Sequence, residues 1–135
     1  MKKDISIPVS ENVYIAAIYE LHPEYEIYDW NIYLINDWDQ PLENVLVVSH
    51  AYGKIDGEMR QTSRLRHGFA TVPAKTAIKV EFIDPKVLVL NNEFAVTYFL
   101  GNTLYDKKFV FRENTINEHA QTDLPTIDRR GVLVK

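Results

Sequence analysis

The stretch FAVTYFLGNTLYDKKFVFR, residues 94–112, carries the clearest structural signal in the chain. It contains two runs rich in aromatic and β-branched residues, which favour extended strands. Gly101 and Asn102 separate the runs, and a two-residue loop of this kind joins antiparallel strands in a tight hairpin. In that register Tyr98 lies opposite Tyr105, a stabilising aromatic pair. The sequence therefore predicts a β-hairpin.

Similar short runs precede this hairpin, with single prolines and glycines between them. They cover residues 25–36, 45–52, 59–66, 77–83 and 87–90. Apolar and polar residues alternate along several of them, which is typical of strands that bury one face. In residues 77–83 the alternation predicts Val80 and Phe82 on one side and Lys79 and Glu81 on the other. Seven or eight such strands predict an all-β fold, a two-sheet antiparallel sandwich.

Residues 10–21 allow two interpretations. Ser10 could cap a helix that contains Ala16 and Ala17 and ends before Pro23. The many β-branched and aromatic residues in the same stretch favour a strand. Both structures are compatible with the sandwich.

Three segments resemble immunoglobulin-like and fibronectin type III-like domains. NIYLIN (residues 31–36) and PLENV (residues 41–45) look like their second and third strands, and VPAKTAIKV (residues 72–80) is similar to the proline-containing approach to their fifth strand. The resemblance covers roughly residues 25–112 and implies an immunoglobulin-like sandwich. The cysteine pair of antibody domains is missing, and a resemblance of fold implies no particular activity.

Composition narrows the classes of function. The chain has 135 residues, a net charge of −4 and no cysteine. Its length predicts one domain, residues 1–135, with residues 113–135 as a C-terminal extension. Without cysteine there are no disulfides, thiolate zinc sites or cysteine nucleophiles. The negative charge makes nucleic acid and anionic membranes poor partners. The N-terminus lacks the apolar run of a signal peptide, so we expect a cytoplasmic protein, although a mature secreted form would look the same.

No catalytic or cofactor motif stands out. None of the four serines lies in a Gly-x-Ser-x-Gly elbow, and the four histidines are too far apart in sequence for a local metal pair. Ser49 and His50 are adjacent, but neighbours on a strand point to opposite faces, so they should not pair as nucleophile and base. We therefore predict no catalytic residue, no bound metal and no cofactor.

An acidic turn surrounds Trp38. Asp37, Asp39 and Glu43 could supply oxygen ligands to calcium, or they could simply form the turn, for which aspartate is well suited. The same carboxylates are the basis of an alternative hypothesis, in which the chain is a small hydrolase or carbohydrate-active domain. That hypothesis requires a pocket with two carboxylates, one of them with a raised pKa.

Two groups of side chains are candidates for an interaction surface. If residues 59–66 form one strand, Arg60, Arg64 and Arg66 share a face, which could bind an anion or could protect a sheet edge from aggregation. The other group is aromatic and follows from the alternation in residues 25–36. If Tyr28 and Trp30 point to the core, the remaining aromatic residues of this region face a ligand or partner: Tyr25, Tyr33 and Trp38.

The leading hypothesis is therefore a non-enzymatic binding or protein-interaction module, and a structural accessory domain of a multiprotein assembly is a further alternative. The C-terminal extension should be loosely held over residues 113–126. Residues 132–134 are three consecutive apolar residues, and exposing them to water would be unfavourable. We expect them to dock as a strand, preferably on the chain's own sheet and otherwise on a second copy or a partner.

Overall fold

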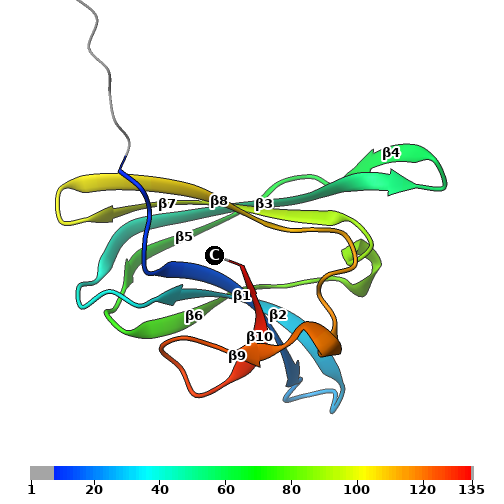
Figure 1. The fold of residues 1–135 in the computed structure, drawn as a ribbon, viewed down its shortest axis with the longest axis horizontal. Helices are drawn as coiled ribbons and strands as arrows, with labels where there is room; N and C mark the ends of the chain where they lie inside the picture. Colours follow the sequence, from blue (N-terminus) through cyan, green and yellow to red (C-terminus); the bar gives the residue numbers. More distant parts are fainter. Residues whose placement is uncertain (1–7, 135) are drawn as a thin grey trace, which may run out of the picture.

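Residues 8–134 are described by a computed structural model, in which two antiparallel sheets pack face to face (Figure 1). The first sheet has the strand order β6-β2-β1-β10-β9, and its members are β1 (Val13–Leu21), β2 (Tyr28–Asn36), β6 (Thr76–Phe82), β9 (Thr122–Asp123) and β10 (Arg130–Val134). The second has the order β4-β3-β7-β8, with β5 also paired to β3, and its members are β3 (Leu42–Ile55), β4 (Glu58–Gln61), β5 (Leu65–Val72), β7 (Asn91–Leu100) and β8 (Thr103–Phe111). Two short 3-10 turns lie in the connections, η1 (Pro85–Val87) and η2 (Glu118–Ala120).

The predicted all-β sandwich is confirmed, with ten strands within residues 8–134 instead of seven or eight. One main core lies between the sheets, and its largest fully buried side chains include Ile15, Ile32, Leu34, Phe94 and Tyr98. The predicted hairpin is β7–β8, and Tyr98 lies opposite Tyr105 as expected. No helix within residues 8–134 is long and apolar enough to cross a membrane.

Residues 13–21 form a strand and not a helix. β1 pairs with β2 along its whole length and with β10 on its other edge. Four consecutive residues, Ile15 to Ile18, are buried, because Ile15 and Ala17 face the main core while Ala16 and Ile18 face a second apolar cluster on the outer side of the sheet. A strand buried on both faces shows no alternation, which explains why the sequence also fitted a helix.

The C-terminal extension is held firmly by the rest of the chain. Docking of residues 132–134 on the chain's own sheet is confirmed, since β10 pairs antiparallel with β1. The prediction that residues 113–126 are loosely held is wrong. Ile116 is 4% exposed and joins the main core, and Leu124 is 7% exposed and covers the outer side of β1. These isolated apolar residues have no period, so their burial could not be predicted from the sequence pattern.

The predicted basic strand of residues 59–66 does not exist as one strand. β4 ends at Gln61 and β5 begins at Leu65. Thr62 bonds to Ala51 of β3 and Leu65 lies opposite Ser49, so between these two contacts the chain has one residue more than β3. One extra residue inverts the two faces of a strand. Arg60 lies opposite Gly53 and Arg66 lies opposite Val48. Gly53 and Val48 point to opposite faces of β3, so Arg60 and Arg66 do too, and the arginines form no common stripe.

A second irregularity occurs in β6 and also corrects the predicted faces. Ile32 of β2 lies opposite Glu81, but the next residue, Tyr33, lies opposite Lys79, so Val80 is an extra, bulged residue. Directly opposed residues share a face. Glu81 therefore points inward with Ile32, and Phe82 points outward with Asn31, which reverses the predicted sides of these two residues.

Candidate functional site

Exposed apolar side chains gather where β1, β2 and β6 meet the loop at residues 22–27. We call this surface the apolar end, and its members, which are 49–69% exposed, are Leu21, Tyr25, Ile27, Tyr28 and Phe82. Four of them line a cavity of about 480 Å³ on the outer side of the first sheet. Apolar side chains that are exposed together around one cavity often mark a binding surface.

The loop that presents Tyr25 and Ile27 is fixed by its own hydrogen bonds. The backbone N–H of His22 donates to the carbonyl oxygen of Ile27 at 2.6 Å, and the N–H of Glu26 donates to that of His22 at 3.2 Å. Nδ1 of His22 accepts from the N–H of Glu24 at 3.1 Å, and the His22 and Tyr25 rings lie 4.7 Å apart. The apolar side chains are therefore displayed on a preformed loop, which lowers the entropic cost of binding.

Asn31 adds a polar group to the lining of this cavity. Its side chain is on β2, and the residue is only 4% exposed. Nδ2 donates to Glu20 at 2.7 Å and to Asp29 at 3.2 Å, but the buried Oδ1 has no hydrogen-bond partner among residues 8–134. A buried acceptor without a donor is costly, so this amide lowers the stability of the sheet beside the cavity.

The three aromatic residues predicted to form one surface lie apart. Tyr25 is exposed at the apolar end, whereas Trp38 follows the opposite end of β2 and packs, partly buried, against the main core. The Tyr33 hydroxyl donates to Glu20 at 2.8 Å, and the Arg129 guanidinium lies 5.7 Å from the centre of its ring. Of the three, only Tyr25 is part of the apolar end. Tyr28, which the alternation placed with Trp30 on the expected core face, is 58% exposed there, and the sequence did not identify Leu21, Ile27 and Phe82.

Glu20 is the centre of a polar bridge between β1 and the C-terminal extension. Its carboxylate accepts hydrogen bonds from Arg129 at 2.7 Å, from Tyr33 and from Asn31. Burial opposes ionisation of Glu20, but these hydrogen bonds outweigh it and hold its pKa below the ordinary value of 4.5. Burial and the adjacent carboxylate raise the pKa of Tyr33. The bridge therefore consists of ionised Glu20, neutral Tyr33 and cationic Arg129.

The lowered pKa of Glu20 predicts a pH-dependent contribution to stability. A depressed carboxyl pKa stabilises the fold above the unfolded value, and this contribution is lost as the pH falls through the folded value. Glu20→Gln should lower the free energy of unfolding by about 1–2 kcal/mol at neutral pH, because charge-assisted hydrogen bonds become neutral ones. In urea titrations the gap should shrink as the pH falls below the ordinary value of 4.5. Glu58→Gln, at a side chain 71% exposed, is the control. A gap for Glu20→Gln that is constant over this range would contradict the assignment.

The acidic turn around Trp38 does not converge on one point. Oδ1 of Asp37 accepts from the Thr126 hydroxyl at 2.7 Å and from the Lys75 ammonium at 3.1 Å, and these two contacts hold its pKa below the ordinary value. The side chain of Asp39 is 94% exposed, and Glu43 accepts a hydrogen bond from Thr71. Within residues 8–134 no three histidine, aspartate or glutamate side chains form a group that could hold a metal. The hydrolase hypothesis needed a raised pKa here, and Asp37 has the opposite shift.

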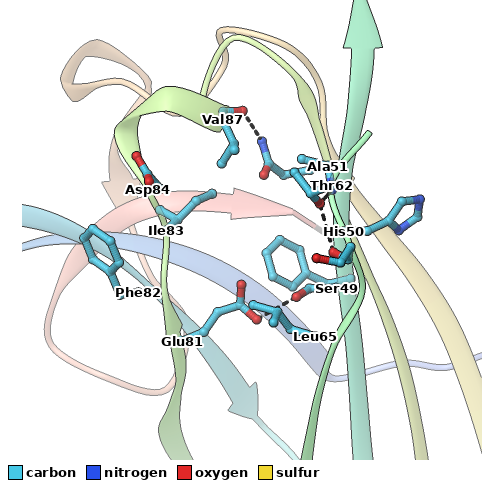
Figure 2. A pocket seen from close by; sticks show the side chains of 13 residues that line it. Ser49, His50, Ala51, Thr62, Leu65, Glu81, Phe82, Ile83, Asp84 and Val87 are labelled. Carbon is cyan, nitrogen blue, oxygen red and sulfur yellow. Dashed lines mark hydrogen bonds between the residues drawn. The ribbon is translucent and has the colours of Figure 1, made fainter. Parts of the chain in front are cut away.

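A second cavity, of about 300 Å³, lies between β3 and β6 where the chain passes from β4 to β5 (Figure 2). Ser49 and Glu81 both line it, and the Ser49 hydroxyl donates to Oε1 of Glu81 at 2.7 Å. Nε2 of His67, on β5, contacts the same oxygen at 3.0 Å. We call this group of three side chains the Glu81 cluster. The sequence did not identify it, because its members lie on three strands and the bulge in β6 is needed to turn Glu81 inward.

The adjacent pair Ser49 and His50 behaves as predicted. Ser49 points into the second cavity, whereas the ring of His50 points away from it (Figure 2). His50 stacks on Tyr52 and lies 3.6 Å from a carboxylate oxygen of Glu93. In the Glu81 cluster the carboxylate lies between serine and histidine. A serine nucleophile needs the histidine next to it, so this is not the arrangement of a Ser-His-acid triad.

Comparisons with models of protein families, with curated proteins and with solved structures found no match to the chain. Function is therefore inferred from the two cavities. Phe82 lines both of them.

Proposed function

We propose that the chain is a non-enzymatic binding module on an immunoglobulin-like sandwich and that the apolar end is its protein-binding surface. The order β6-β2-β1 in one sheet and β5-β3-β7-β8 in the other supports the immunoglobulin-like assignment, because it separates the strands as those domains do. The observation that carries the proposal is the bulge at Val80, which turns Phe82 away from the core and towards Tyr25 and Ile27.

Exposure of Phe82 gives up burial that a regular strand would have provided. A fully buried phenylalanine contributes about 2–3 kcal/mol, so a bulge that exposes half of this side chain sacrifices stability. Bulges often re-aim a side chain towards a functional site. Aromatic residues in a pocket are typical of the centre of a protein interface, and Asn31 and Lys79 add polar groups to the lining of this one.

The charges around the apolar end favour a protein partner over a lipid or a nucleic acid. Glu24 and Glu26 are exposed on the loop, and Asp29 lines the cavity beside it. Carboxylates at these positions would be repelled by an anionic bilayer or by phosphate groups. A protein surface with apolar side chains and basic groups at their edge complements both the apolar wall and these carboxylates.

The test compares capture of partners by three immobilised proteins from a lysate of the source cells. The triple variant Tyr25→Ser, Ile27→Ser, Phe82→Ser should lose partners that the wild type retains, with affinity weakened at least about tenfold. The control variant Leu46→Ser, Leu104→Ser removes side chains that are 40% and 47% exposed on the second sheet, and it should retain them.

Identical sets of proteins on the wild type and on the triple variant would refute the proposal. Turnover of a substrate by the purified wild type, with no partner retained, would also refute it. If size-exclusion chromatography shows a wild-type dimer that the triple variant does not form, the partner is a second copy of this chain.

A further inference from the structure

The second cavity has apolar walls and an acidic base. Ile83 and Val87 point into it in Figure 2, and Leu65 and Phe94 complete the apolar lining. Its volume of about 300 Å³ matches the smaller ligand pockets of proteins. The polar groups are concentrated near Glu81, whose side chain is only 12% exposed.

The hydrogen bonds of Glu81 leave half of its carboxylate free. Ser49 and His67 both contact Oε1, and no group within residues 8–134 donates a hydrogen bond to Oε2. In Figure 2 one carboxylate oxygen is directed to Ser49 and the other towards the middle of the cavity. An ionised carboxylate accepts up to four hydrogen bonds, so the site can accept more from a ligand.

The lining is also unbalanced in charge. Asp84 lies at the rim, where Oδ1 accepts the N–H of Lys86, and it adds a second carboxylate. None of the described residues that line the cavity is lysine or arginine. The only ion-pair contact that Glu81 makes within residues 8–134 is the one with His67. A buried carboxylate is stabilised by a cation that also donates hydrogen bonds.

We propose that this cavity binds an alkylammonium or guanidinium group, with the cation on Oε2 of Glu81 and the alkyl chain against Ile83, Val87 and Phe94. The Ser49 hydroxyl and His67 hold the carboxylate in position through Oε1. The site is distinct from the apolar end, although Phe82 lines both cavities. The cation is either a free small amine or a lysine or arginine side chain of a partner.

The test is an NMR titration of the wild type with n-butylammonium, and the readout is the backbone amide signals of Ser49, Leu65 and Glu81. It is run at about pH 8, at which an alkylammonium group is charged. We expect saturable shifts, and none with 1-butanol, which has a similar size and no charge.

Two glutamate variants separate the role of charge from that of structure. Glu81→Gln keeps an oxygen that can accept from Ser49 but removes the charge, and it should weaken binding at least about tenfold. Glu93→Gln alters a glutamate of similar exposure, 16%, which contacts His50 instead, and it should bind as the wild type does. Should Glu81→Gln lose the dispersed spectrum of a folded protein, the contrast between butylammonium and butanol on the wild type decides alone.

Absence of saturable shifts, equal shifts with butanol, or undiminished binding to a folded Glu81→Gln would overturn the proposal. A second probe, N-acetyl-lysine methylamide, distinguishes the sources of the cation. Comparable binding of this blocked lysine identifies a side chain of a partner as the ligand. Binding of butylammonium alone identifies a free amine, because the blocked backbone then does not fit at the rim.

Discussion

Removal of residues 131–135 is expected to lower the melting temperature by about 15 °C. β10 is seated between β1 and β9, and Val132 is 6% exposed, while Leu133 and Val134 are half-buried. At the usual value for buried apolar area, the three side chains together contribute about 5 kcal/mol. Because the strand belongs to the same chain, the loss should be the same at every protein concentration. Circular dichroism melts at two concentrations measure it.

A point variant tests the pairing of β10 with β1 without removing the apolar side chains of residues 132–134. A Cβ atom at Gly131 would lie 2.6 Å from the carbonyl oxygen of Ala17, so Gly131→Ala should force β10 away from β1. At Gly68, also on a strand, the nearest atom to an added Cβ is 4.0 Å away, and Gly68→Ala is the control. A truncated protein that melts like the wild type, or that changes only its oligomeric state, would contradict the intramolecular seating of β10.

Asn36→Ala is expected to lower the free energy of unfolding by about 3 kcal/mol. This side chain is fully buried at the end of β2. Its Nδ2 donates to the carbonyl oxygens of Gln40, Val72 and Pro73 at 2.9–3.2 Å, and its Oδ1 accepts from the N–H of Trp38 at 2.9 Å. Alanine would leave these backbone groups with unsatisfied hydrogen bonds in a region closed to water.

The variant Asn36→Asp separates the role of this amide as a hydrogen-bond acceptor from its role as a donor. It keeps an acceptor for Trp38 but places a carboxylate against three carbonyl oxygens, so at neutral pH it should be at least as unstable as Asn36→Ala. At low pH the protonated acid can donate one hydrogen bond, and part of the stability should return. Urea titrations at both pH values test this. An Asn36→Asp protein as stable as the wild type at neutral pH would show that these contacts contribute little.

The fold class was predictable because most strands show their buried face in the sequence. The hairpin of residues 94–112 carries its turn and its aromatic pair within one short stretch, so its register could be predicted without the rest of the chain. β1 was ambiguous for a physical reason. Ala16 and Ile18 are covered by Leu124, a residue over 100 positions later, and no local pattern reports a contact of that kind.

The Glu81 cluster was missed and only Tyr25 of the apolar end was predicted, because both sites depend on an inserted residue in a strand. Alternation assigns every second residue to one face, and a bulge inverts this assignment from its position onward. At Val80 the inversion turns Glu81 into one cavity and Phe82 onto the apolar end. Between β4 and β5 it separates Arg60 from Arg66. A bulge leaves no fixed residue signature, so the sequence predicted regular strands in both places.

The role of the apolar end as a protein-binding surface is tested most directly by site-specific photocrosslinking in the source cells. A benzophenone side chain is placed at Tyr25 in one protein and at Leu104, 47% exposed on β8, in another. We expect a discrete covalent adduct with a protein from the Tyr25 position and none from the Leu104 position, because contact with a partner should be confined to the apolar end. Absence of an adduct at Tyr25, or the same adducts from both positions, would contradict this role.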